Sequence, residues 1–223
     1  AAEDVMVARN VSLAELTGAR LHLAHISTAG SVRMVREAKA RGLKVTAEAC
    51  PHHFTLTEET TRGYNTHAKM NPPLRTSEDV QAIKDGLRDG TIDVIATDHA
   101  PHATQEKQQE FTEAPFGIVG LETALSLTLA LVEEGVLTLE SAVDKLATAP
   151  AKAFSLNAGT LAVGAPADVA IVDPNLEWEV DPSRFRSKSR NTPFAGWKVK
   201  GRVTTTIVSG RIVYELDRPG RPA

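Results

Sequence analysis

The residues best suited to chemistry in this sequence lie in one stretch, residues 93–102, which reads Asp-Val-Ile-Ala-Thr-Asp-His-Ala-Pro-His. Its apolar part, 94–96, is typical of a buried parallel strand. Three titratable side chains follow where the chain leaves the sheet: Asp98, His99 and His102. Ligands bind beyond the carboxyl ends of the strands in parallel α/β sheets. The stretch therefore predicts a metal-dependent hydrolytic site centred on Asp98.

Two other predicted strands end in residues of the same kind. One ends at residues 25–27, His-Ile-Ser, and another is followed by His52 and His53. One histidine at a strand end is more often structural than functional, but three successive strands ending in this way favour a functional site. Imidazole nitrogen and carboxylate oxygen are ligands of Zn²⁺ in catalytic sites, which usually have three or more protein ligands. Only His25 and Asp98 are well placed for this role.

The other titratable residues on these strands have plainer interpretations. The adjacent histidines 52–53 point to opposite sides, and a structural turn at Pro51 explains them better than metal binding does. His22 is expected to face away from His25 and to be a satisfied core histidine. Glu48 lies in mid-strand and would be costly to bury alone, so we expect it to pair with a neighbouring lysine or histidine rather than to act in catalysis.

Residues 69–75, Lys-Met-Asn-Pro-Pro-Leu-Arg, predict a rigid loop, because the two prolines fix φ and restrict the residue before them. Asn71 in this loop can both donate and accept hydrogen bonds, which suits an amide-like ring. A solvated asparagine in a turn that leads into a helix explains the loop equally well.

Alternating strands and helices are predicted to position these residues. Strand patterns cover 21–27, 44–50 and 93–96, and helical patterns cover 3–17, 30–42, 76–90, 121–132 and 138–146. This alternation predicts a parallel sheet with right-handed crossovers. Three β/α units are too few for a closed barrel, which takes about 250 residues, so they form either a small open sheet or the last part of a barrel. The polar loop 103–114 has the composition of a mobile lid, and a plain surface loop fits it nearly as well.

The pattern changes at about Asn157 to short β segments separated by glycine and proline. Segments 168–173, 204–208 and 211–214 are of this kind, and they predict a small β domain beside the α/β part. We therefore divide the chain into two predicted domains, residues 1–157 and residues 158–223.

The composition is that of an ordinary globular protein, with 42% hydrophobic and 24% charged residues and a net charge of −3 over 223 residues. A charge so close to neutral gives no electrostatic footprint for nucleic acid or for an anionic membrane. No run approaches the roughly 18 apolar residues that a membrane span needs. The single Cys50 excludes an internal disulfide and fits a reducing, cytoplasmic setting.

Several segments resemble the bacterial dihydroorotases of the amidohydrolase superfamily. The stretch 96–102 is similar to the signature of that family. The similarity continues, in the order of the family, through residues 25–28, 46–48, 51–53, 69–75, 114–120 and 191–194. Residues 149–154, 159–161 and 167–169 are similar to the closing pattern of the superfamily. The resemblance covers essentially the whole chain.

The resemblance implies the last strands and helices of a (β/α)8 TIM-type barrel, with a small β-sandwich at its side and a binuclear zinc centre. The strands of this chain then correspond to the sixth, seventh and eighth of the barrel. His25 corresponds to a zinc ligand, and Asp98 to a residue that is both zinc ligand and catalytic base. The substrate contacts correspond to Asn71, His102, Phe116 and Gly117, of which the last two are expected to act through their backbone.

The other metal ligands of the family have no counterpart in this sequence. The paired histidines of the first strand, the bridging residue of the fourth strand and the histidine of the fifth would precede Ala1. We therefore expect the sequence to be the carboxyl-terminal half of the enzyme and the amino-terminal half to be its partner. Alone, these residues are expected neither to close a barrel nor to bind two zinc ions, and so to be inactive.

The resemblance implies the reversible hydrolysis of dihydroorotate, a small-molecule substrate, to N-carbamoyl-aspartate in pyrimidine biosynthesis. One alternative is another cyclic amidase, such as an allantoinase or hydantoinase, against which His102 and the Asn71 loop argue. The other is a non-catalytic scaffold for aspartate transcarbamoylase, against which the intact His25 and Asp98 argue. A homodimer and a complex with aspartate transcarbamoylase are left open as assemblies, and neither nucleic acid nor a membrane is expected as a partner.

Overall fold

The computed structural model describes residues 1–216, and residues 217–223 of the second predicted domain lie outside the described residues. The predicted parallel sheet is confirmed. Its strands are β1 (Leu21–Leu23), β2 (Val45–Ala49) and β3 (Val94–Ile95), and β2 lies in the centre. Leu21 pairs with Val45 at one end of the sheet, and Ala49 pairs with Ile95 at the other.

All three strands are shorter than the sequence predicts, and the backbone of two functional candidates explains where two of them stop. His25 has a φ of 53° and Asp98 a φ of 45°, both in the left-handed region. A residue in that region cannot continue an extended strand. The extended segments therefore end before His25 and before Asp98.

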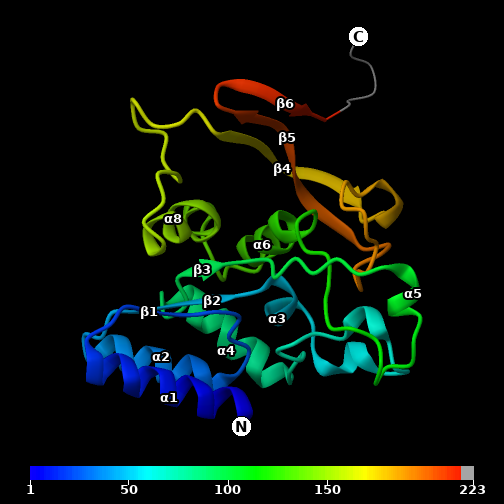
Figure 1. The fold of residues 1–223 in the computed structure, drawn as a ribbon. Coiled ribbons are helices and arrows are strands. Elements are labelled where there is room, and N and C mark those ends of the chain that lie inside the picture. Colours follow the sequence, from blue (N-terminus) through cyan, green and yellow to red (C-terminus); the bar gives the residue numbers. More distant parts are fainter. Residues whose placement is uncertain (217–223) are drawn as a thin grey trace.

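Three helices follow the predicted pattern on one face of the sheet: α1 (Ala2–Thr17), α2 (Ala29–Ala40) and α4 (Ser77–Arg88). Their ends have local causes. Gly18 adopts a left-handed φ of 69° where α1 ends. Thr76 and Asp79 form a capping box that begins α4. Figure 1 shows α1 and α2 side by side, with α4 against the sheet.

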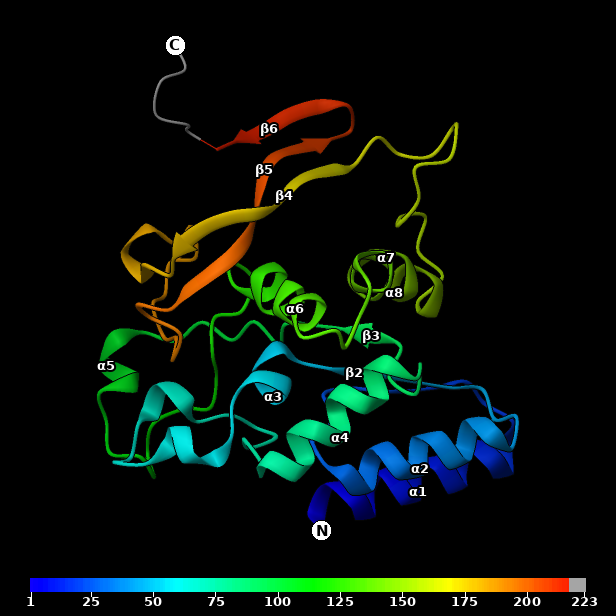
Figure 2. The same cartoon turned by 180° about the vertical axis from the view of Figure 1, so that it is seen from behind.

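The helices of the second face depart further from the prediction. They are α6 (Ala124–Glu133), α7 (Leu139–Val143), the π-helical turn η3 (Asp144–Thr148) and α8 (Ala149–Ala153). The helix predicted to end at residue 146 thus continues to Ala153, while α6 starts three residues later than predicted. Figure 2 shows α6 and α8 on the side of the sheet opposite α1 and α2.

The connecting segments contain short helices. They are α3 (Pro51–Thr55), η1 (Glu58–Thr61), η2 (Thr66–Ala68), α5 (Thr104–Lys107) and η4 (Pro182–Arg184). The predicted structural turn at Pro51 is the short helix α3. The expectation that His52 and His53 point to opposite sides is wrong, because their ring centroids lie 4.2 Å apart. Pro51 begins that helix, a position that suits proline because the first helical residue needs no N–H donor.

The β region forms one antiparallel sheet of β4 (Val169–Glu179), β5 (Lys198–Val208) and β6 (Arg211–Glu215). It packs on α6 at one close contact. A Cβ atom at Gly201, where φ is 88°, would lie 2.1 Å from Leu129 of α6. The Gly201 carbonyl there accepts hydrogen bonds from Ser126 at 2.7 Å and Trp178 at 3.0 Å. A glycine at this position lets the sheet approach the helix.

One hydrophobic core joins the parts of the fold. It includes Val35 of α2, Ile83 of α4 and Leu131 of α6, together with Phe194 from the segment before β5. Among residues 1–216, the helices are all too short or too polar to span a membrane.

Candidate active site

His25 and Asp98 meet at the carboxyl ends of the strands. They follow the two outer strands, β1 and β3, and their side chains face each other with His25 Nε2 3.7 Å from Asp98 Oδ1. Both side chains are partly open to solvent, with exposed fractions of 31% and 28%. The left-handed backbone at non-glycine residues costs about 1–3 kcal/mol each and is concentrated at functional sites.

Glu48 of β2 contacts His25 and a second histidine, each with a different carboxylate oxygen. Oε1 is 2.7 Å from His25 Nδ1, and Oε2 is 3.1 Å from His22 Nε2. Burial alone would raise the pKa of Glu48, but the contacts with both histidines lower it to about 2. The hydrogen bond that His25 donates to Glu48 raises the pKa of His25, against the opposite effect of burial. The predicted pairing of Glu48 with a histidine is confirmed.

His22 is satisfied as predicted, but it does not face away from the site. It contacts Thr46 Oγ1 at 2.8 Å and packs edge-on against Phe154. It reaches the same carboxylate as His25 because β1 stops at Leu23, so the strict alternation of a strand no longer separates residues 22 and 25.

The donors at this strand end fit a divalent cation. The Nδ1 atom of His25 is turned toward Glu48, which leaves Nε2 on the side of Asp98. An imidazole nitrogen and a carboxylate oxygen are ligands that zinc takes in catalytic sites. These two side chains could supply two of the three or more protein ligands that such a site needs.

A second group of ligand-type side chains, Cys50, His52 and His53, lies next to His25. Their ligand atoms lie within 4.8 Å of one another, and Cys50 Sγ is 3.4 Å from His25 Nδ1. Burial lowers the pKa of His52, lowers that of His53 to about 4 and raises that of the Cys50 thiol. The composition suits a cation, but all three side chains are buried, whereas a catalytic metal needs an open position.

His102 and Gly117 form a second contact. A Cβ atom at Gly117, where φ is 143°, would lie 2.8 Å from His102 Cδ2 and 2.7 Å from the Ala100 Cβ. Only glycine therefore allows the two segments to approach so closely. Gly117 N–H already donates to the Lys69 carbonyl at 2.8 Å, which ties this contact to the loop that carries Asn71.

Asn191 is a residue that the sequence pattern does not single out for this site. Its side chain is buried and bridges three backbone groups: it accepts from His102 N–H at 3.1 Å and donates to the carbonyls of Ala100 at 2.8 Å and Gly117 at 3.0 Å. The resemblance of residues 191–194 to the family was the one available signal. These contacts cross 74 to 91 positions in sequence, which no local pattern reveals.

The remaining predicted substrate residues lie on the two loops that Lys69 joins. Lys69 Nζ donates to the Ala114 carbonyl at 2.6 Å and lies 4.8 Å from the centre of the Phe116 ring. Phe116 and Asn71 are both exposed. The loop 103–114 is held in the same way, because the buried Lys107 donates to the Pro115 carbonyl at 2.9 Å.

The side chain of His99 has a structural role. Its Nδ1 atom accepts hydrogen bonds from Gly120 N–H at 3.1 Å and Leu121 N–H at 3.4 Å, just before α6 begins. The proton is then on Nε2, which lies 3.5 Å from Ser187 Oγ. His99 therefore fixes the backbone at Gly120 and Leu121, just before α6.

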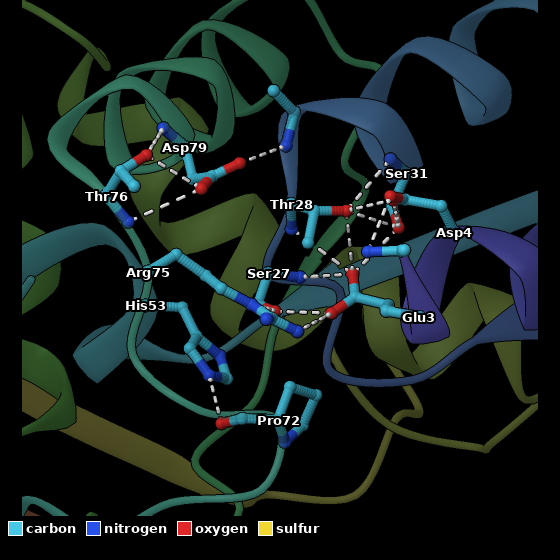
Figure 3. A network of polar contacts seen from close by, with 12 residues as sticks. Glu3, Asp4, Ser27, Thr28, Ser31, His53, Pro72, Arg75, Thr76 and Asp79 are labelled. Carbon is cyan, nitrogen blue, oxygen red and sulfur yellow. Dashed lines mark hydrogen bonds and ion pairs between the residues drawn. The ribbon is translucent and has the colours of Figure 1, made fainter. Parts of the chain in front are cut away.

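A polar network connects α1 to the loop that carries Asn71 (Figure 3). The carboxylate of Glu3 accepts hydrogen bonds from Ser27 N–H at 2.8 Å, from the Ser27 hydroxyl and from Ser31 Oγ at 2.7 Å. It also forms an ion pair with Arg75 at 3.2 Å, and Arg75 in turn donates to Ser27 Oγ at 3.0 Å. The network thus fixes the segment just after His25 relative to the last residue of the 69–75 loop.

We expect Glu3→Gln in the full-length protein to lower the free energy of unfolding by about 1–3 kcal/mol, because it removes a charge that several buried donors bind. Burial raises the pKa of Glu3, but the hydrogen bonds from Ser27 and Ser31 and the charge of Arg75 lower it overall, below the ordinary value of 4.5. This stabilisation is present above pH 4.5 and is lost as the pH falls through the folded-state pKa. Urea unfolding at neutral and at acidic pH measures the difference from the wild type.

The matched control for this prediction is Glu15→Gln, which removes an exposed ion pair with Arg41 and should change the stability by less than about 1 kcal/mol. Equal losses in the two variants at neutral pH would contradict the assigned importance of the Glu3 network.

The chain is similar to known proteins both in sequence and in fold. The model of the amidohydrolase family matches residues 9–213. The chain is 62% identical to a dihydroorotase of Syntrophotalea carbinolica over 216 residues, which are 97% of this chain and 51% of that protein. It is 59% identical to a dihydroorotase of Anaeromyxobacter sp. (strain K) over 222 residues, or 99% of this chain and 51% of that protein. The chain thus spans about half the length of the curated relatives it matches.

Solved structures with the same fold include a hydantoinase and a dihydropyrimidinase. The L-hydantoinase (dihydropyrimidinase) of Arthrobacter aurescens matches with a TM-score of 0.90 at 32% identity, over 95% of this chain and 48% of that one. A dihydropyrimidinase of Brevibacillus agri matches with a TM-score of 0.89 at 26% identity, over 95% of this chain and 48% of that one.

Proposed function

This chain belongs to the amidohydrolase family, and we propose that it is the carboxyl-terminal half of a dihydroorotase, which hydrolyses dihydroorotate reversibly to N-carbamoyl-aspartate in pyrimidine biosynthesis. The observation that carries this proposal is the 62% identity to a dihydroorotase over 97% of the chain. The hydantoinase and dihydropyrimidinase structures are similar in fold but only 26–32% identical. They support the wider class, a cyclic amidohydrolase.

The family and the structural neighbours imply the TIM-barrel superfamily, and the described chain is α/β. We propose that β1, β2 and β3 are the sixth, seventh and eighth strands of the barrel. The order β1-β2-β3 leaves the outer edges of β1 and β3 to be paired by strands of the amino-terminal half. In this proposal residues 1–157 complete the barrel, and the antiparallel sheet in residues 158–223 is part of a β-sandwich.

We propose that the complete enzyme binds two zinc ions and that His25 and Asp98 are the ligands this chain contributes, the others being in the amino-terminal half. Zinc supplies two effects in such a site: it polarises the carbonyl under attack and lowers the pKa of water toward neutrality. The fit rests on the adjacent Nε2 and Oδ1 atoms and on the partly open position of both side chains.

Asp98 is proposed to move the proton. In hydrolysis the carboxylate takes a proton from the attacking water, whose oxygen forms a bond with the ring carbonyl carbon. As the bond between that carbon and the ring nitrogen breaks, Asp98 gives the proton to the departing nitrogen, and N-carbamoyl-aspartate results. Cyclisation is the reverse, with Asp98 starting as the proton donor. The partly exposed carboxylate is accessible for both transfers.

The substrate is proposed to be held by the two joined loops. His102 is suited to the substrate carboxylate as a donor, and Asn71 to the amide edge of the ring. Because Gly117 N–H is occupied by the Lys69 carbonyl, a free backbone donor for the ring would come from Phe116, while Gly117 keeps His102 close.

A cytoplasmic location, a homodimer and a complex with aspartate transcarbamoylase stay predictions.

We expect the full-length zinc-loaded protein to hydrolyse dihydroorotate with a kcat/KM on the order of 100-fold above that for dihydrouracil, which lacks the ring carboxylate that His102 is proposed to bind. Steady-state assays with dihydroorotate, dihydrouracil, hydantoin and allantoin measure this preference. Preference for any of the last three would replace the proposal by another cyclic amidase. A zinc-loaded protein without turnover of any of the four would support the non-catalytic scaffold.

A further inference from the structure

Glu48 occupies a distinctive place in the parallel sheet. It lies on the central strand β2, its side chain is only 8% exposed, and each of its oxygens faces a different histidine. The contact with His25 Nδ1, at 2.7 Å, is the shorter of the two. A buried carboxylate that binds two imidazoles is costly to desolvate, so its position calls for a reason beyond packing.

The contact with Glu48 decides which ring nitrogen of His25 carries the proton. A carboxylate only accepts hydrogen bonds, so His25 must donate from Nδ1, and the neutral ring then has its lone pair on Nε2. Nε2 is the atom that faces Asp98 at 3.7 Å. The same contact therefore sets both the tautomer and the direction of the donor atom.

His22 and Thr46 hold the carboxylate in turn. His22 Nε2 binds the second oxygen of Glu48 at 3.1 Å, and its other nitrogen contacts Thr46 Oγ1 at 2.8 Å. His22 is also packed against Phe154. A carboxylate bound on both oxygens cannot rotate without breaking one contact, whereas His25 itself lies beyond the last residue of β1 and has a left-handed backbone.

We propose that Glu48 is a positioning residue that fixes the tautomer and the ring orientation of His25, so that Nε2 is ready to bind a metal ion. The proposal rests on the proposed function only in taking His25 as a metal ligand. His22 is the support that keeps Glu48 in place. Carboxylates that orient metal-binding histidines commonly change metal affinity by 10–100-fold when they are removed.

The test uses the full-length protein with Glu48→Ala and Glu48→Gln. We expect Glu48→Ala to weaken zinc affinity by about 10–100-fold, measured by competition with a chelator. Glu48→Gln should have a smaller effect, because its amide oxygen still accepts a hydrogen bond from one histidine. The control is Glu37→Gln, which changes an exposed carboxylate near Arg33 and should leave zinc affinity unchanged.

A second measurement separates positioning from stability. In ¹⁵N-histidine NMR spectra of the metal-free protein, we expect His25 to be in the Nδ1–H form in the wild type and in a mixture of tautomers in Glu48→Ala. Unchanged zinc affinity and an unchanged tautomer in a folded Glu48 variant would overturn the proposal, even if that variant were less stable.

The outcomes distinguish this proposal from the proposed function. The wild-type protein could fail to hydrolyse dihydroorotate while Glu48→Ala still weakens zinc binding and mixes the tautomers of His25. That result would refute the proposed function and keep the proposed role of Glu48. If the wild-type protein hydrolyses dihydroorotate but its Glu48 variants bind zinc normally, the proposed function is kept and the proposed role of Glu48 is refuted. If Glu48→Ala fails to fold, Glu48→Val decides, because valine also removes both acceptor oxygens but suits a strand position. Wild-type zinc affinity and a wild-type tautomer in that variant overturn the proposal.

Discussion

Asp98→Asn in the full-length protein is expected to lower kcat for dihydroorotate by about 10⁴-fold or more while changing KM by only a few fold. The amide has nearly the shape of the carboxylate but cannot take up a proton, so the loss falls on the chemical step. The residue also loses its charge opposite His25, which is expected to weaken its proposed role as a metal ligand. Steady-state kinetics and zinc analysis of the same preparation measure the two effects.

The backbone at Asp98 makes asparagine the suitable replacement. Its φ of 45° lies in the left-handed region, which asparagine and aspartate tolerate better than other residues with side chains. The variant should therefore fold normally. Asp85→Asn is the control, since Asp85 lies on α4 in an exposed pair with Arg88 and should retain full activity. Near-normal turnover by Asp98→Asn would remove Asp98 from its proposed role.

Local signals in the sequence were sufficient for the α/β framework. Thr76 with Asp79, and Gly18 after an amphipathic stretch, mark helix ends because a cap depends only on residues within one turn. The buried pattern before Asp98 identifies a strand for the same reason. The cost of burying a carboxylate alone also led to the prediction that Glu48 pairs with a lysine or a histidine, and the structure shows two histidines.

Features that depend on tertiary contacts could not be predicted from local patterns in the sequence. The left-handed backbone of His25 is uncommon for histidine, so the predicted strand ran on to residue 27 and placed His22 on the wrong side. Asn191 joins His102 and Gly117 across more than 70 positions, and no local pattern of polar and apolar residues predicts that role. The strands β4 and β5 extend beyond their predicted lengths because each continues to pair with the other across bulges.

His25→Asn tests the metal site from the other side and decides between two sets of donors. Asparagine tolerates the left-handed φ of 53° at this position, so the protein should fold. Loss of the imidazole is expected to weaken zinc binding in the full-length protein by more than about 100-fold, beyond the range seen for residues that only orient ligands. Turnover of dihydroorotate should fall with the zinc content, measured by elemental analysis after dialysis.

The neighbouring cluster of Cys50, His52 and His53 gives the opposite expectation. Its atoms lie within 4.8 Å of one another but are closed to solvent, and burial raises the pKa of the Cys50 thiol, which opposes formation of the thiolate that zinc binds. Cys50→Ser should therefore leave the zinc content and turnover close to those of the wild type. If Cys50→Ser released the zinc and His25→Asn kept it, the metal would belong to the buried cluster, and the assignment of His25 and Asp98 as metal ligands would be wrong.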